Sequence, residues 1–184
     1  MKCLTFDSTI VAIAPIEPLE GEARRDAERR TALELVRRLT GQADATIGHT
    51  AWGAPFIEQY PDISLSVSHS RRLAAVAIDP TRPIGLDIEE PREQLQRVAS
   101  RFLAADELAI LESITDREAL TFELVQAWTI KEALVKISGE NVPDLRRDLR
   151  ALPHPAIRGR RCVIVASLTL EPPFADHHLS LLTP

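Results

Sequence analysis

Two segments in different halves of this chain share a residue pattern, which suggests that the fold contains two similar units. Residues 31–41 read TALELVRRLTG and residues 129–139 read TIKEALVKISG. Thr, Glu and Gly are identical at one constant offset, and each segment has the apolar spacing of a helix that ends at a glycine. Any helix with a glycine cap looks somewhat like another, so coincidence is the alternative to duplication. We favour duplication, which predicts two halves related by a pseudo-twofold axis, with a ligand groove between them.

The order of the expected elements is typical of the α+β class. Strands are predicted at 3–14, 64–68, 73–78, 84–89, 162–170 and 178–182. Helices are predicted at 21–40, 94–102, 105–111 and 122–137, and a loop at 42–62, which contains several Gly and Pro residues. We expect half-domains at 1–83 and 84–184 that form one catalytic unit, each a small, mostly antiparallel sheet packed on a long helix.

The stretch 84–89 (IGLDIE) places two carboxylates on one face of a predicted strand. Asp87 and Glu89 are two residues apart, and strand side chains alternate between faces, so both leave the same side. Neighbouring carboxylates repel unless a cation neutralises them, and Mg²⁺ prefers oxygen ligands. An Asp-x-Glu pattern is common, so an ordinary polar strand end is the alternative.

The stretch 128–136 (WTIKEALVK) adds a third carboxylate and two ammonium groups on a predicted helix. Glu132 and Lys136 are four residues apart, with Lys131 beside Glu132, so we expect them to share one helix face. Surface helices contain many such Glu–Lys pairs, which is the simpler interpretation. Trp128 and Val135 lie near this face and favour an inward orientation, where charged groups need partners such as a metal ion and phosphate oxygens.

Composition and charge narrow the class of protein. The 184 residues suit one compact unit, and the net charge of −5 argues against general nucleic-acid binding. The N-terminus lacks the long apolar stretch of a signal peptide, and no run is long enough to cross a membrane. We therefore expect a cytoplasmic protein with no membrane partner and, because two fused halves have less need to dimerise, a monomer.

Two further groups are candidates for phosphate contacts. His69 follows the alternating stretch 64–68 (SLSVS), although a lone His at a strand end is more often a turn residue. Arginines cluster on the first predicted helix, where interspersed acidic residues indicate a mostly solvated face.

Five segments, taken together, resemble the phosphopantetheinyl transferase superfamily, of the type with two fused halves in one chain. They occur in the family's order over roughly residues 53 to 139, and the joint match is specific although each piece alone is weak. The segments are Gly53-Ala54-Pro55, Ser66-Val67-Ser68-His69, Gly85-Leu86-Asp87-Ile88-Glu89, Arg101-Phe102 with Glu107, and Trp128-Thr129-Ile130-Lys131-Glu132 with Lys136.

The resemblance implies a Mg²⁺-dependent reaction in which a serine of an acyl or peptidyl carrier protein takes the 4′-phosphopantetheine arm of coenzyme A. Adenosine 3′,5′-bisphosphate leaves. By the same analogy Asp87, Glu89 and Glu132 bind Mg²⁺, and Lys131 and Lys136 hold phosphate oxygens. His69 binds the 3′-phosphate and Glu107 is the base for the serine proton, with Lys136 and Glu132 also counted as catalytic. Ser68, Gly53 and Pro55 belong to the implied coenzyme A site.

One position departs from the family pattern. The family often has Lys or Arg between the Gly and Pro of the first loop, where this chain has Ala54. Arg25 or Arg29 is our hypothesis for the residue that compensates. A coenzyme A- or carrier-binding protein without turnover is the main alternative function, and a Mg²⁺-dependent phosphate hydrolase is a third. The pathway that the carrier serves is left open.

Overall fold

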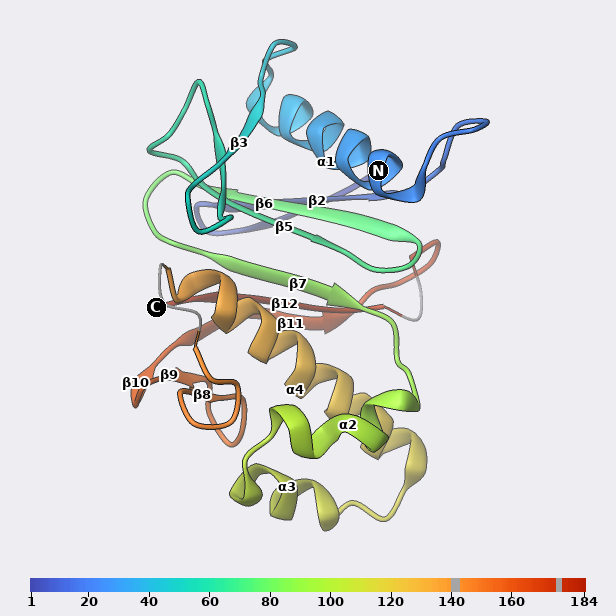
Figure 1. Ribbon diagram of the computed structural model, residues 1–184, viewed down its shortest axis with the longest axis vertical. Helices are drawn as coiled ribbons and strands as arrows, with labels where there is room; N and C mark the ends of the chain where they lie inside the picture. The colour runs from blue at the N-terminus through green and yellow to red at the C-terminus, as the bar shows by residue number, and fades with distance from the viewer. Residues whose placement is uncertain (140–142, 175–176) are drawn as a thin grey trace.

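The structure is a computed structural model that describes residues 1–139, 143–174 and 177–184, and it has a mixed α and β architecture (Figure 1). The first part of the chain forms β1 (Lys2–Phe6), β2 (Thr9–Pro15), α1 (Arg24–Thr40), β3 (Ile47–His49), β4 (Pro55–Ile57), β5 (Ser64–His69) and β6 (Leu73–Asp79). The second part forms β7 (Gly85–Glu89), α2 (Gln94–Phe102), α3 (Ala105–Glu112), α4 (Arg117–Ile137), β8 (Leu149–Arg150), β9 (Ala156–Ile157), β10 (Arg160–Arg161), β11 (Val163–Thr169) and β12 (His178–Thr183).

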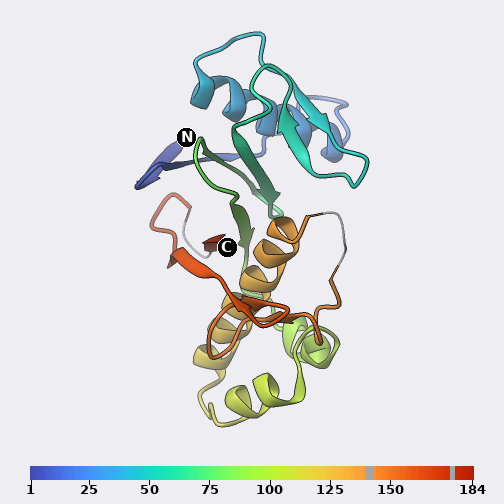
Figure 2. The ribbon, with the colours of Figure 1, turned by 90° about the vertical axis from the view of Figure 1, so that its left-hand side faces the viewer.

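Each long helix covers one antiparallel sheet. The first sheet has the order β1-β2-β6-β5, and α1 packs its apolar stripe, which includes Leu35 and Val36, against this sheet. The second sheet has the order β11-β12-β7, and α4 packs against β7 and β12. Figures 1 and 2 show α1 at one end of the molecule and α4 with α2 and α3 at the other, with the sheets β1-β2-β6-β5 and β11-β12-β7 between them.

The two sheets follow the same order of connection. In the first half the chain runs through β2, α1, β5 and β6, and β6 lies between β2 and β5 in the sheet. In the second half it runs through β7, α4, β11 and β12, and β12 lies between β7 and β11. The sheet faces that point away from the helices share one apolar core. Val11 and Ile13 of β2 contribute to it together with Leu86 and Ile88 of β7.

Serine side chains join the two halves along β5 and β7. The backbone N–H groups of Ile84, Leu86 and Ile88 donate to the hydroxyls of three alternate residues of β5 at distances of 3.2, 2.9 and 3.2 Å. The hydroxyls, which we call the serine seam, belong to Ser64, Ser66 and Ser68. The alternating stretch 64–68 thus satisfies backbone donors along the free edge of β7, which would be costly to bury unpaired.

Close approach of backbone fixes α4 against β7. A Cβ atom built on Gly85 would lie 2.1 Å from the backbone oxygen of Ala133. Glycine is therefore required where the strand passes under the helix, and this contact sets the depth at which the following residues of β7 meet α4.

Two expectations about the N-terminal half are wrong in detail. The single opening strand predicted at 3–14 is a hairpin of β1 and β2, because Asp7 takes a left-handed conformation with φ of 52° and reverses the chain. The predicted loop at 42–62 contains the β3–β4 hairpin, in which Gly48 pairs with Phe56. A Cβ at Gly48 would lie 2.6 Å from the Phe56 ring, which explains the glycine.

Among the residues that the structure describes, no helix is both long and apolar enough to cross a membrane.

Candidate active site

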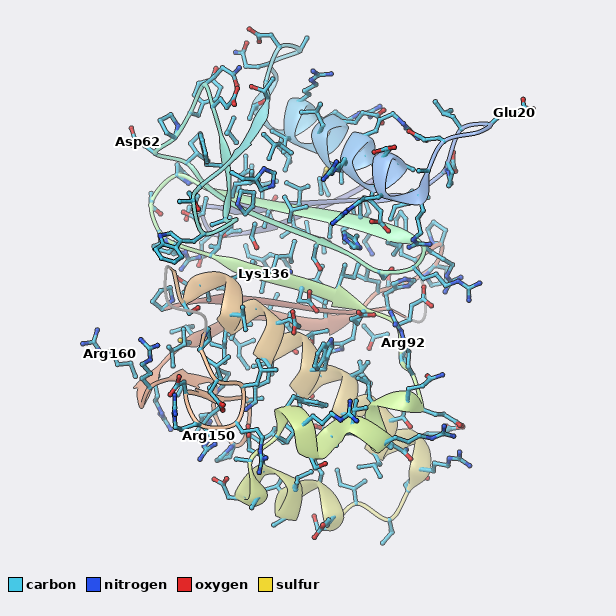
Figure 3. The ribbon with its side chains drawn as sticks, viewed as in Figure 1. Glu20, Asp62, Arg92, Lys136, Arg150 and Arg160 are labelled. Carbon is cyan, nitrogen blue, oxygen red and sulfur yellow. The ribbon has the colours of Figure 1, made fainter. Side chains whose placement is uncertain are left out.

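A cavity of about 860 Å³ lies between α1, the β3–β4 hairpin, β5 and the C-terminal end of α4. It brings together six of the residues that the sequence singled out: Arg25, Arg29, Gly53, Pro55, His69 and Lys136. A second hollow of about 550 Å³ shares Glu28 and His69 with the first and extends to Glu89 and Arg92. We call the two hollows together the cleft. Figure 3 shows Lys136 at the boundary between the halves and Arg92 beyond the end of β7.

The α1 side of the cleft carries two arginines and one carboxylate, Glu28, which is paired with Arg24 and lies 3.5 Å from His69. Arg25 and Arg29 are four residues apart on α1, so they lie on one helix face. Within the described residues the ion pairs of α1 arginines involve Arg24 and Arg30, which leaves the guanidinium groups of Arg25 and Arg29 for a ligand. Two guanidinium groups and the Lys136 ammonium on one cavity suit an anion such as a phosphate.

Asp87 and Glu132 do not themselves line either hollow, but Asp87 contacts Lys136, which lines the first one. The Asp87 side chain is 8% exposed, and its Oδ1 accepts hydrogen bonds from Ser68 Oγ at 2.7 Å and Lys136 Nζ at 2.9 Å. Lys136 Nζ also donates to the Leu86 carbonyl at 2.6 Å, which ties the end of α4 to β7. Asp87 Oδ2 is buried and has no hydrogen-bond partner among the described residues. An unpaired carboxylate oxygen in this position is costly unless a ligand supplies the missing partner.

Glu89 and Glu132 flank Asp87. Burial raises the pKa of the Glu89 carboxyl, the Arg92 guanidinium lowers it and the charge of Asp87 raises it further. Burial likewise raises the pKa of the Glu132 carboxyl, and again the charge of Asp87 adds to this shift while Lys136 opposes it. Both residues therefore lie within electrostatic reach of Asp87, and the protein holds their negative charges at a cost.

The three predicted metal ligands do not form a preformed cage. In the described part of the chain, no group of three His, Cys, Asp or Glu side chains is arranged to hold a metal ion. Protein cations contact two of the three carboxylates: Lys136 contacts Asp87, and Arg92 is paired with Glu89. The free Oδ2 of Asp87 and two carboxyls with raised pKa still fit a hard divalent cation, which would replace these contacts.

The structure does not bring Lys131 and Glu107 to the cleft. Both side chains are 0% exposed, and Lys131 Nζ lies 2.7 Å from Glu107 Oε2. The other two donors of Lys131 reach the carbonyls of Leu145 and Leu149, each at 2.7 Å. Burial lowers the pKa of the Lys131 ammonium, and the Glu107 hydrogen bond opposes that shift.

Glu107 is equally well satisfied. Its carboxylate accepts the backbone N–H groups of Ala104, Ala151 and Leu152 at 2.9, 2.7 and 3.2 Å. The pair links α3 and α4 to the segment around 145–152. The expectation that Lys131 shares a face with Glu132 and Lys136 failed because consecutive helix residues are rotated by about 100°, which turns Lys131 toward α3.

Sequence reasoning missed one residue of the cavity and two structural roles. Trp52, with 64% of its surface exposed, lines the cavity beside Gly53, and no motif of the sequence indicates it. The hydroxyl of Ser68 supports Asp87 and the backbone of Ile88, which the sequence does not predict. His178 lies outside the cavity, and no local motif signals its burial.

Comparisons with known proteins agree on one family. A model of the 4′-phosphopantetheinyl transferase superfamily matches residues 83–179. The 4′-phosphopantetheinyl transferase psf-1 of Bacillus pumilus is 36% identical over 92 residues, which cover 49% of this chain and 38% of that protein. HetI of Nostoc sp., also named a 4′-phosphopantetheinyl transferase, is 35% identical over 82 residues. These residues cover 44% of this chain and 34% of HetI. A 4′-phosphopantetheinyl transferase of Bacillus subtilis is 30% identical over 54% of this chain. The chain spans less than half the length of these relatives, with 44% of the Bacillus subtilis protein covered.

The buried pair predicts a large loss of stability when one partner is removed. Lys131→Met leaves the buried Glu107 carboxylate with only the more distant Arg150 guanidinium, 3.9 Å away, and should lower the free energy of unfolding by about 3 kcal/mol. Adding Glu107→Gln should recover part of this loss, because the amide is uncharged and keeps an oxygen for Ala151 N–H. Urea unfolding measures both effects. If Lys131→Met alone were as stable as the wild type, the pair would have no structural role.

The raised pKa of Glu132 predicts a pH-dependent stability with a definite sign. Since the pKa in the fold lies above its ordinary value of 4.5, this group stabilises the fold at low pH, and the contribution is lost as pH rises through the folded pKa. Glu132→Gln should therefore raise the unfolding temperature by about 2–4 °C near neutral pH in chelator, and by less at about pH 4. The exposed residue Glu112 provides the control, as Glu112→Gln. A lower unfolding temperature for Glu132→Gln at neutral pH would refute the assignment.

Proposed function

The chain belongs to the 4′-phosphopantetheinyl transferase superfamily, and we propose that it moves the 4′-phosphopantetheine arm of coenzyme A to a serine of an acyl or peptidyl carrier protein, with release of adenosine 3′,5′-bisphosphate. The observation that carries the proposal is the contact of Asp87 with Lys136, which lines the same cavity as Arg25 and Arg29. This contact joins the segment 85–89, which contains Asp87, to the segment 128–136, which contains Lys136.

In this proposal the arginines and His69 hold the nucleotide end of coenzyme A. Arg25 and Arg29 face the same cavity as Gly53 and Pro55, and His69 lies where the two hollows meet. This arrangement supports Arg25 and Arg29 as the phosphate contacts that replace the missing basic residue at Ala54. Phosphates bound there direct the pyrophosphate toward Lys136, whose flexible stem and ammonium suit an oxygen of that group.

The acidic residues are proposed to act on the pyrophosphate from the other side. Asp87, Glu89 and Glu132 would hold Mg²⁺, and Lys136 would pass from Asp87 to a phosphate oxygen. When bound, Mg²⁺ supplies positive charge where the transferred phosphoryl group develops negative charge. The chain's own contribution is alignment, because phosphoryl transfer depends mainly on positioning and charge neutralisation. We propose that Glu107 and Lys131 position α4 and do not contact the substrate.

The finer points of the fold are part of the same proposal. The equal order of connection in β2-β6-β5 and β7-β12-β11, and the matching helix ends at Gly41 and Gly139, support two duplicated halves divided near residue 83. Both glycines have positive φ, of 70° and 75°. The monomeric state and the cytoplasmic location stay predictions from the sequence.

The transfer reaction is tested with purified protein, coenzyme A, Mg²⁺ and a set of apo carrier proteins. Intact-mass spectrometry should show the carrier gain one phosphopantetheine arm. Asp87→Asn should lower the rate at least about 100-fold, because the missing charge removes transition-state stabilisation. Arg160→Ala, an exposed position remote from the cleft (Figure 3), is the control. Coenzyme A binding without transfer to any carrier would favour the non-catalytic alternative, and bisphosphate release without carrier would favour the hydrolase.

Arg25 and Arg29 should contribute to binding more than to turnover. Arg25→Ala and Arg29→Ala should each raise the KM for coenzyme A by about 5- to 150-fold with a small change in kcat, since a lost charge-assisted hydrogen bond costs about 1–3 kcal/mol. Arg38→Ala lies on the same helix, is exposed and does not line the cavity, so its KM should match the wild type. Equal KM values in all three variants would place the nucleotide elsewhere.

A further inference from the structure

A layer of polar side chains lies between α4 and the second sheet, where an apolar interface is expected. Gln126 Nε2 donates to Ser167 Oγ at 3.1 Å, and Ser167 Oγ lies 3.0 Å from His178 Nε2. One helical turn further along α4, the hydroxyls of Thr129 and Ser180 are 2.8 Å apart. These residues do not touch the cavity, so the proposed chemistry gives no account of them.

His178 is the member of this layer whose hydrogen bonds are incomplete. Its side chain is buried, and the ring stands edge-to-face with Phe122 at a centroid distance of 5.3 Å. Nδ1 is buried and has no hydrogen-bond partner among the described residues. Because an unmet buried polar atom costs about 1–3 kcal/mol, such an atom needs an explanation.

The hydrogen-bond chain allows Nδ1 to be a donor, and we take this tautomer as a premise. Ser167 Oγ accepts the Gln126 amide N–H, and its own O–H can then donate to His178 Nε2. Burial lowers the pKa of His178 to about 4, so the ring is neutral near pH 7. A neutral ring that accepts at Nε2 carries its single hydrogen on Nδ1.

The strand register places His178 beside one of the proposed metal ligands. His178 of β12 pairs with Glu89 of β7, and Ser180 pairs with Asp87. Directly opposite residues of an antiparallel pair lie on the same sheet face with Cβ atoms about 4.5–5.5 Å apart. His178 is therefore the neighbour of Glu89 on the interior side, whereas Arg92 holds the Glu89 carboxylate on the solvent side.

We propose that His178 is a positioning residue for Glu89, whose carboxylate leaves Arg92 and accepts the Nδ1–H of His178 when the cleft binds a divalent cation. The hydrogen bond fixes one carboxylate oxygen and leaves the other directed toward Asp87 and the cation, as outer partners of metal-binding carboxylates do. The exchange satisfies the donor on Nδ1 and frees Arg92 at the edge of the cleft. This inference rests on the metal site of the proposed function.

Two substitutions separate the two ring nitrogens. In His178→Asn the amide nitrogen can take the place of Nδ1, whereas in His178→Gln it takes the place of Nε2. The Asn variant thus keeps a donor for Glu89 and loses the Ser167 contact, and the Gln variant does the reverse. His154→Asn, at an exposed position, is the matched control.

The measurement is Mn²⁺ affinity by calorimetry, with unfolding temperatures in chelator and transfer rates in parallel. We expect His178→Gln to weaken Mn²⁺ binding about 10-fold or more and His178→Asn to stay within about threefold of the wild type. The ranking of the His178 variants by unfolding temperature should differ from their ranking by Mn²⁺ affinity. Equal affinities in both variants, or a loss that tracks stability, would overturn the role of His178, as would a wild type that binds no Mn²⁺. A wild type that transfers no arm to any carrier would instead overturn the proposed function, whatever the affinities of the variants.

Discussion

The serine seam determines how the two halves of this protein meet. Three hydroxyls of β5 take the place of the strand that would otherwise pair with the open edge of β7. Hydroxyl acceptors satisfy the backbone donors without extending one continuous sheet, so the first half can turn relative to the second and leave a cavity above the junction. Ser68 has two roles, since it accepts from Ile88 and donates to Asp87. The junction of the halves and the position of the central acidic residue therefore depend on the same side chain.

A second constraint acts from the other side of β7. The contact of Gly85 with the backbone of α4 and the hydrogen bond from Lys136 to the Leu86 carbonyl hold the helix end close to the strand. Glu132 is thereby brought within electrostatic reach of Asp87. The cleft thus has rigid walls of sheet and helix, which suits a reaction that depends on alignment.

Two groups of buried charge in this half differ in how far the protein satisfies them. Glu107 and Lys131 use their hydrogen-bonding capacity on each other and on backbone, and such a pair serves the fold. The acidic group next to the cleft instead includes an Asp87 oxygen that has no partner in the described part of the chain, and two carboxyls with raised pKa. Stability is given up there, which is typical of sites that bind a cation or a charged substrate. The orphaned Nδ1 of His178, one strand away, belongs to the same incompletely satisfied region.

The sequence by itself determined the helices, most of the strands, the shared face of Asp87 and Glu89, and part of the cavity lining, because these follow from local periodicity and from one specific set of motifs. It did not reveal the turn at Asp7, which uses a left-handed non-glycine residue, or the β3–β4 hairpin within a stretch rich in Gly and Pro. Only the tertiary structure decided which charges are satisfied. Lys131 and Lys136 look equivalent in the motif, yet one is enclosed by α3 and the segment around 145–152 while the other reaches the cleft. Partners so distant along the chain leave no local pattern, so burial and pairing could be assigned only after the elements had packed.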